Sequence, residues 1–193
     1  MIRHFVRAAL FLAVVASSAH AASGNLTVFD DTDENGFNNA AANCSTGSIF
    51  GETQVVHSGT AAIAISKQQD NDGAGWTAPA IYSTSSDYDG VTFWVNSGNS
   101  QSSITSLAVF DASNTGHFLH LEDVYGAALP ANTWIQFQIP FASPYFQVAL
   151  STPPDSVQAI CVITHSPTGS AGDFLYLDDF SLRGADIFKN GFD

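Results

Sequence analysis

Short runs of β-branched and aromatic residues, separated by turn-forming residues, constrain the fold of this chain more than any other feature. The runs cover residues 63–66, 91–96, 107–110, 118–121, 134–140, 157–164 and 174–182. Pairs such as Ser58-Gly59 and Asp89-Gly90 separate them. Strands at short, fairly regular spacing are typical of a β-sandwich or barrel. No stretch of about 12 residues or more repeats its apolar residues with a helical period. We therefore predict an all-β fold.

Residues 1–21 have the order of parts found in a secretory signal peptide. Arg3 and Arg7 precede an apolar run over 8–16, and Ala19-His20-Ala21 has the small residues of a cleavage site. The run is much shorter than the ~20 residues that span a bilayer as a helix. We predict one domain over 22–183 that is secreted, extracellular or periplasmic, with no membrane span, and a tail over 184–193.

The mature chain is strongly acidic. Without the signal, Lys67, Arg183 and Lys189 stand against 18 Asp and Glu residues, which gives a formal charge of −15. Nucleic-acid binding needs cations that neutralise phosphates, so we expect no nucleic-acid partner. Hydrophobic residues make up 45% of the chain, which excludes a composition typical of disordered proteins. The charge favours a partner that is neutral or cationic.

Two cysteines, Cys44 and Cys161, remain after the signal. Export permits a disulfide between them, and closing a loop of about 100 residues is worth roughly 4–5 kcal/mol in the chain-entropy model. We favour this internal disulfide. Unpaired thiols and a disulfide to another chain are the alternatives.

Several segments resemble, in order, the non-catalytic jelly-roll carbohydrate-binding modules of secreted bacterial glycosidases. The segments are Val28-Phe29-Asp30-Asp31, Val56-His57-Ser58-Gly59, and residues 88–95, 130–140 and 174–180. Residues 38–45 lack the Trp-rich stretch of many such modules. The resemblance implies a single jelly-roll β-sandwich with a carbohydrate ligand. The end of the chain, residues 187–193, resembles the Ile-Phe-x-x-Gly-Phe-acidic endings of some exported proteobacterial proteins.

The resemblance also implies a structural Ca²⁺ where the first and last strands meet. Calcium takes six to eight oxygen ligands, largely from carboxylates and carbonyls. Asp178 is the first candidate ligand, because strand alternation would place it on the face that carries Phe180, where a buried acid needs a cation or hydrogen bonds. Asp30 and Asp31 are the N-terminal candidates, and Glu52 is a weaker one. A hydrogen-bonded acid cluster without a metal is the alternative.

Aromatic rings are the expected sugar contacts of such a module. Trp76 follows Gly73-Ala74-Gly75 at the start of a strand, so it is the first candidate for a ligand platform. Tyr82 and Tyr125 come after it. A packing role for Trp76 is the alternative, and it is almost as well supported.

Catalytic motifs are not recognisable. His117 and His120 have the spacing of a metal pair, but residues three apart on a strand face opposite ways. The chain has no Gly-x-Ser-x-Gly elbow. We therefore expect a non-catalytic protein that binds neutral polysaccharide or oligosaccharide. The alternatives are an acidic structural or adhesive surface domain and a small secreted glycoside hydrolase or lyase, which would need two facing carboxylates.

Overall fold

The computed structural model describes residues 24–39, 44, 46–101, 104–146, 153–165 and 172–185. The predicted signal peptide over 1–21 and all but the first two residues of the predicted tail lie outside this part. The described elements are β1 (Leu26–Asp30), β2 (Thr32–Asp33), β3 (Ser48–Glu52), β4 (Ala62–Ser66), β5 (Asp72–Ser83), β6 (Tyr88–Asn96), β7 (Ile104–Phe110), β8 (Gly116–His120), α1 (Leu121–Tyr125), β9 (Trp134–Pro140), β10 (Ser156–His165) and β11 (Phe174–Gly184).

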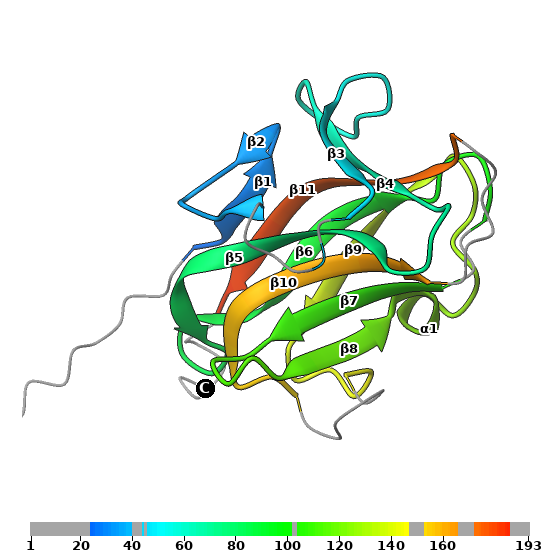
Figure 1. Ribbon diagram of the computed structural model, residues 1–193. Helices are drawn as coiled ribbons and strands as arrows, with labels where there is room; N and C mark the ends of the chain where they lie inside the picture. The colour runs from blue at the N-terminus through cyan, green and yellow to red at the C-terminus, as the bar shows by residue number, and fades with distance from the viewer. Residues whose placement is uncertain are drawn as a thin grey trace, which may run out of the picture.

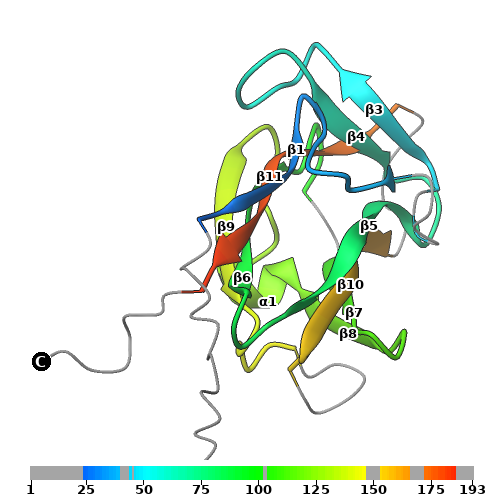
Figure 2. The same ribbon diagram turned by 90° about the vertical axis from the view of Figure 1, so that its left-hand side faces the viewer.

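These strands form two antiparallel sheets that face each other as separate layers (Figures 1 and 2). Sheet A has seven strands, with β11 at its centre. Sheet B has four, in the order β5-β10-β7-β8. The structure confirms the predicted all-β sandwich, and each predicted run lies on a strand except for Leu121, which begins α1. The described helix, α1, is too short to cross a membrane.

The core lies between the two layers and is rich in aromatic rings. Trp76 of β5 reaches across from sheet B to Phe180 of β11, with their ring centroids 5.1 Å apart. Phe180 in turn stacks on Phe93 of β6 at 4.8 Å. All three side chains are completely buried. Burying a large apolar side chain stabilises the fold by roughly 1.5–3 kcal/mol, so this stack joins the sheets.

Strand β11 contains a bulge that reverses its side-chain alternation. Asp178 pairs with Trp94 of β6, but the next pair is Ser181 with Thr92, so β11 carries one extra residue. Asp179 takes up this residue in a left-handed conformation, with φ 51°. Leu177 before the bulge and Phe180 after it both point into the core. Asp178 therefore lies on the outer face, and the prediction that it shares the face of Phe180 is wrong.

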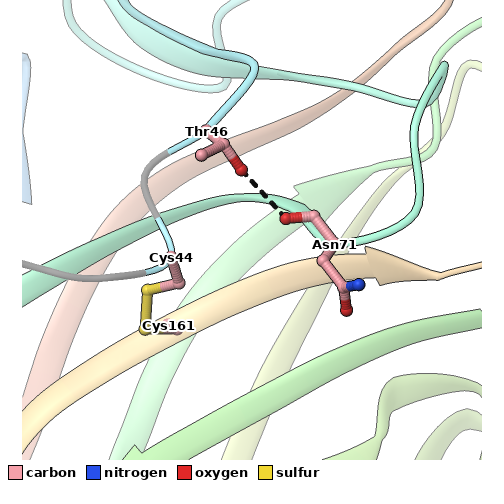
Figure 3. Close-up of a disulfide and its surroundings, with 4 residues drawn as sticks. All are labelled: Cys44, Thr46, Asn71 and Cys161. Carbon is pink, nitrogen blue, oxygen red and sulfur yellow. Dashed lines mark hydrogen bonds between the residues drawn. A yellow bond between two sulfur atoms is a disulfide. The ribbon is translucent and has the colours of Figure 1, made fainter.

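The structure confirms the predicted disulfide. Cys44 is bonded to Cys161 of β10, and Figure 3 shows this disulfide on β10 with Thr46 and Asn71 nearby. Thr46 Oγ1 donates a hydrogen bond of 3.0 Å to the carbonyl of Asn71, just before β5 begins. The disulfide and this hydrogen bond therefore hold Cys44 and Thr46, which precede β3, against the outer face of sheet B. A disulfide of this kind is consistent with an extracellular protein.

Candidate functional site

A cavity of about 280 Å³ lies between the β1–β2 hairpin and β3, which stand near each other at the edge of sheet A (Figure 1). We call it the Phe50 pocket. Its lining residues come from the hairpin, from the segment after it and from β3, namely Phe29, Asp31, Thr32, Asp33, Asn39, Phe50 and Gly51. The pocket thus combines an apolar wall with polar groups, as small-molecule sites do.

Aromatic rings form the apolar wall. Phe29 is buried and Phe50 is half-buried, and their centroids lie 6.2 Å apart in an edge-to-face arrangement. Trp76 lies behind both rings, 6.1 Å from Phe50 and 6.3 Å from Phe29. Edge-to-face packing of this kind adds to the stability gained from burial alone. The core therefore supports Phe50 from behind while part of its ring stays accessible.

Asp33 is held rigidly on the polar side of the pocket. Its Oδ1 accepts a hydrogen bond of 2.8 Å from Trp76 Nε1, and its Oδ2 accepts one of 3.2 Å from the backbone N–H of Asn39. One donor belongs to the core and the other to the neighbouring segment. The Asp33 carboxylate is therefore fixed before any ligand arrives.

Asp31 is fixed from the opposite side, by the loop before β4. Its Oδ1 accepts hydrogen bonds from the N–H groups of Thr60, at 2.6 Å, and Ala61, at 2.7 Å. These backbone donors lower the pKa of the Asp31 carboxyl, because they favour its charged form. Asp31 is therefore ionised and immobile at neutral pH. Gly59 permits this approach, because a Cβ there would overlap the carboxylate and its φ is +62°.

Asp178 and Asp179 hold the first half of the same loop. Asp178 Oδ2 accepts from the N–H groups of His57, at 2.9 Å, and Ser58, at 3.3 Å. Asp179 accepts 2.7 Å bonds from Ser58 Oγ and lies 2.7 Å from His57 Nδ1. Residues 57–61, which we call the anchored loop, are thus tied to β11 and to the β1–β2 hairpin by three carboxylates.

Two of the acids in this region have raised pKa values. Burial raises the pKa of Asp178, against the opposing effect of the N–H groups of His57, Asp179 and Ser58. The pKa of Asp30 is raised by burial and then by the charges of Asp179, Asp31 and Glu34. Negative charge is therefore concentrated where the hairpin meets β11.

These carboxylates do not form a calcium coordination shell as they are arranged here. Asp31 and Asp178 accept protein hydrogen bonds on both of their oxygens. Glu52 Oε1 accepts a 2.6 Å bond from the N–H of Gln54. Across the described ranges, no group of three or more His, Cys, Asp or Glu side chains is placed to hold a metal ion. Calcium at Asp178, Asp31, Asp30 and Glu52 stays a prediction of the sequence.

A second aromatic group covers the outer face of sheet A. His57 of the anchored loop stacks on Trp94 of β6, with centroids 3.8 Å apart and planes 17° from parallel. It also meets Trp134 of β9 edge-on at 5.6 Å. One face of the Trp94 ring is therefore already occupied by the protein, which explains this outward-facing tryptophan by packing.

The structure separates the three predicted ligand aromatics. Trp76 is completely buried, so the prediction that it offers a ring face to a sugar is wrong. Tyr82 is half-buried against Phe37 and Tyr88. Tyr125 is 45% exposed at the end of α1. Tyr82 and Tyr125 stay predictions, and neither lines the Phe50 pocket.

Sequence reasoning missed Phe50 and Asp33 as site residues. The sequence prediction named Trp76, which contacts both residues, but its ring lies beneath them in the core. The run Ser48-Ile49-Phe50-Gly51 could have indicated Phe50. Adjacent residues on a strand face opposite sides, so one of its two apolar side chains must face inward. Ile49 is 51% exposed, while Phe50 turns toward the pocket.

Comparison with known proteins gives similarity in fold. No protein-family model matches the sequence, and no curated protein matches it. A family 11 carbohydrate-binding module from Clostridium thermocellum, in complex with a β-1,3-1,4-mixed-linked tetrasaccharide, is similar with a TM-score of 0.48 and 14% identity over 86% of this chain and 98% of that one. The C-terminal family 22 carbohydrate-binding module of a Clostridium thermocellum protein has a TM-score of 0.45 and 11% identity, covering 76% of this chain and 90% of its own.

An agarase structure is also similar, with a TM-score of 0.46 and 14% identity over 84% of this chain and 25% of the agarase. The two antiparallel sheets of this chain make it a β-sandwich, and these carbohydrate-binding modules are similar to it at low sequence identity.

Proposed function

We propose that this protein is a secreted, non-catalytic carbohydrate-binding protein that seats a sugar unit of a neutral polysaccharide or oligosaccharide in the Phe50 pocket. The observation that carries this proposal is the pairing of an accessible ring, Phe50, with two carboxylates that the fold holds in place. An aromatic face packs on the C–H face of a pyranose, and fixed oxygens accept hydrogen bonds from its hydroxyl groups. Immobile groups also reduce the entropy that binding costs.

A binding screen with two neighbouring variants tests this proposal. The mature protein is measured against cellulose, xylan, mannan, β-glucan and chitin, and so are Phe50→Ala and Ile49→Ala. Ile49 adjoins Phe50 but does not line the pocket, so it controls for damage to β3. We expect Phe50→Ala to weaken retention on the preferred glycan about tenfold, because roughly 1.4 kcal/mol of ring contact is lost. Ile49→Ala should bind normally.

Other outcomes assign the function elsewhere. Retention that survives Phe50→Ala but fails in Tyr125→Ala would place the sugar at α1. Retention on no glycan would contradict the proposal and favour a structural or adhesive surface domain. Each variant is also melted with and without EDTA, because a fall in melting temperature on chelation would support the predicted calcium independently of sugar binding.

A further inference from the structure

The charge around the Phe50 pocket has a single sign. Asp31 and Asp33 line the pocket, and none of the described lining residues is basic. Asp30 and Glu34 flank them along the chain, and the pKa of Asp30 is raised by burial first and then by the charges of Asp179, Asp31 and Glu34. The wall of the pocket therefore combines an aromatic ring with a negative potential.

The lysine and arginine side chains of the described residues pair with groups outside the Phe50 pocket. Lys67 is buried, with its Nζ 3.3 Å from Asp173 and 2.8 Å from the carbonyl of Ser97. Arg183 Nε donates a 2.6 Å bond to Asp89. Neither lysine nor arginine in this part of the chain therefore neutralises the carboxylates of the pocket.

The hydrogen bonds to these carboxylates do not cancel their charge either. Asp33 accepts from an indole N–H and a backbone N–H, and Asp31 accepts from two backbone N–H groups and a hydroxyl. All of these donors are neutral, so each carboxylate keeps its full negative charge. The donors fix where that charge lies.

We infer that the Phe50 pocket selects a sugar unit that carries a protonated amino group, as in a glucosamine-type oligosaccharide, over neutral and acidic sugars. This inference rests on the proposed binding of a sugar ring at Phe50, and it changes the preferred sugar unit from a neutral to a cationic one. The pyranose ring would pack on Phe50 while its ammonium group pairs with the fixed carboxylates of Asp31 and Asp33. Hydrogen bonds to charged partners are stronger than those between neutral groups. A uronate in the same pocket would meet like charge.

Matched disaccharides test the inference by calorimetry at about pH 6, where the amine is protonated. The probes are diglucosamine, di-N-acetylglucosamine, cellobiose and digalacturonate. N-acetylation keeps the ring and removes the charge. We expect diglucosamine to bind about tenfold more tightly than its acetylated form, and digalacturonate to bind least. The preference should shrink between about 0.02 M and 0.5 M salt, because screening weakens charge pairing.

Variants separate the pocket from the general acidity of the surface. Asp33→Asn should weaken diglucosamine binding much more than cellobiose binding, because the amide keeps one acceptor oxygen for Trp76 Nε1 but carries no charge to pair with an ammonium group. Asp123→Asn, on an exposed acid of α1, should change neither. An equal loss in both variants would mean diffuse attraction to an acidic surface, and it would overturn the inference.

The remaining outcomes distinguish the inference from the proposal beneath it. If every disaccharide loses affinity in Phe50→Ala but diglucosamine shows no advantage, the proposed function stands and the inference fails. If no disaccharide responds to Phe50→Ala, the proposed function fails. If Ca²⁺ displaces diglucosamine at stoichiometric amounts, the carboxylates form a metal site and the inference is overturned.

Discussion

Trp76 positions two residues of the Phe50 pocket although it does not line the pocket itself. Its ring packs behind Phe29 and Phe50, and its Nε1 holds Asp33. A tryptophan near a glycine-rich segment favours a ring at the start of a strand, but the sequence does not show whether that ring faces solvent or the core. The sequence predicts Trp76 at the surface, whereas the structure buries it between the sheets.

Replacing Trp76 by Phe isolates the contribution of the indole N–H. The smaller ring keeps most of the packing, but Asp33 loses its shortest hydrogen bond. We expect the free energy of unfolding to fall by about 1–3 kcal/mol, as measured by chemical denaturation. Sugar affinity should fall as well, because the Asp33 carboxylate is no longer fixed. Unchanged stability would show that this hydrogen bond contributes nothing.

Gly59 is a second single residue on which the site depends. Its φ is +62°, and a Cβ there would overlap the Asp31 carboxylate. Gly126 has a comparable φ of +85° with no atom within 4 Å of an added Cβ. Both changes to Ala incur the left-handed penalty of about 1–2 kcal/mol, but only Gly59→Ala also displaces Asp31. We expect Gly59→Ala to lower the melting temperature more than Gly126→Ala, and equal losses would contradict this account.

At the scale of elements, the strands could be predicted and their irregularities could not. The seven predicted runs correspond to β4 and to β6 through β11, because each has enough β-branched and aromatic residues to be recognised. Strand β3 has only two apolar residues among Ser, Gly and Glu, and β5 contains glycines and a proline, so neither has a clear pattern. The bulge in β11 follows from the change of pairing partner from β4 to β1, which is a tertiary property.

The anchored loop depends on ionised acids, so it should respond to pH. The pKa of Asp31 is lowered in the folded state, below its ordinary value of 3.8. The stability that Asp31 contributes is therefore fully present above about pH 4 and is lost as the pH falls through its lower folded pKa. Asp31→Asn should be less stable than the wild type at about pH 7, and the difference should shrink toward zero in strong acid.

Urea denaturation of both proteins across this pH range measures that difference. Asp123→Asn serves as the control, because Asp123 is exposed on α1 and lies outside the loop. A difference between wild type and Asp31→Asn that stays constant with pH would mean that the charge of Asp31 is irrelevant to the loop.

At the scale of the whole molecule, the sandwich is held by its core and by one covalent link. The disulfide joins Cys44 to Cys161 across a sequence separation of 117 residues. It ties the approach to β3 against sheet B, while β3 itself pairs with β4 in sheet A. The covalent link therefore connects the two layers on the side that carries the Phe50 pocket.

Replacing both cysteines tests this link. The double variant Cys44→Ser with Cys161→Ser should lose about 2–5 kcal/mol of unfolding free energy and bind its sugar more weakly. The buried cluster between the sheets remains, so the far-UV circular dichroism of a β-protein should persist. An unchanged affinity with lowered stability would show that β3 keeps its place without the disulfide.

Strand β11 pairs with β1, β4 and β6, all of which precede it along the chain. Sheet A therefore has no centre until β11 is present, however complete the earlier strands are. Its contacts join distant parts of the sequence, and such topologies fold slowly. A chain that emerges from its N-terminus would remain without a stable sheet A until β11 has emerged. Any truncation before Phe174 would therefore leave β1, β4 and β6 without the one strand that joins them.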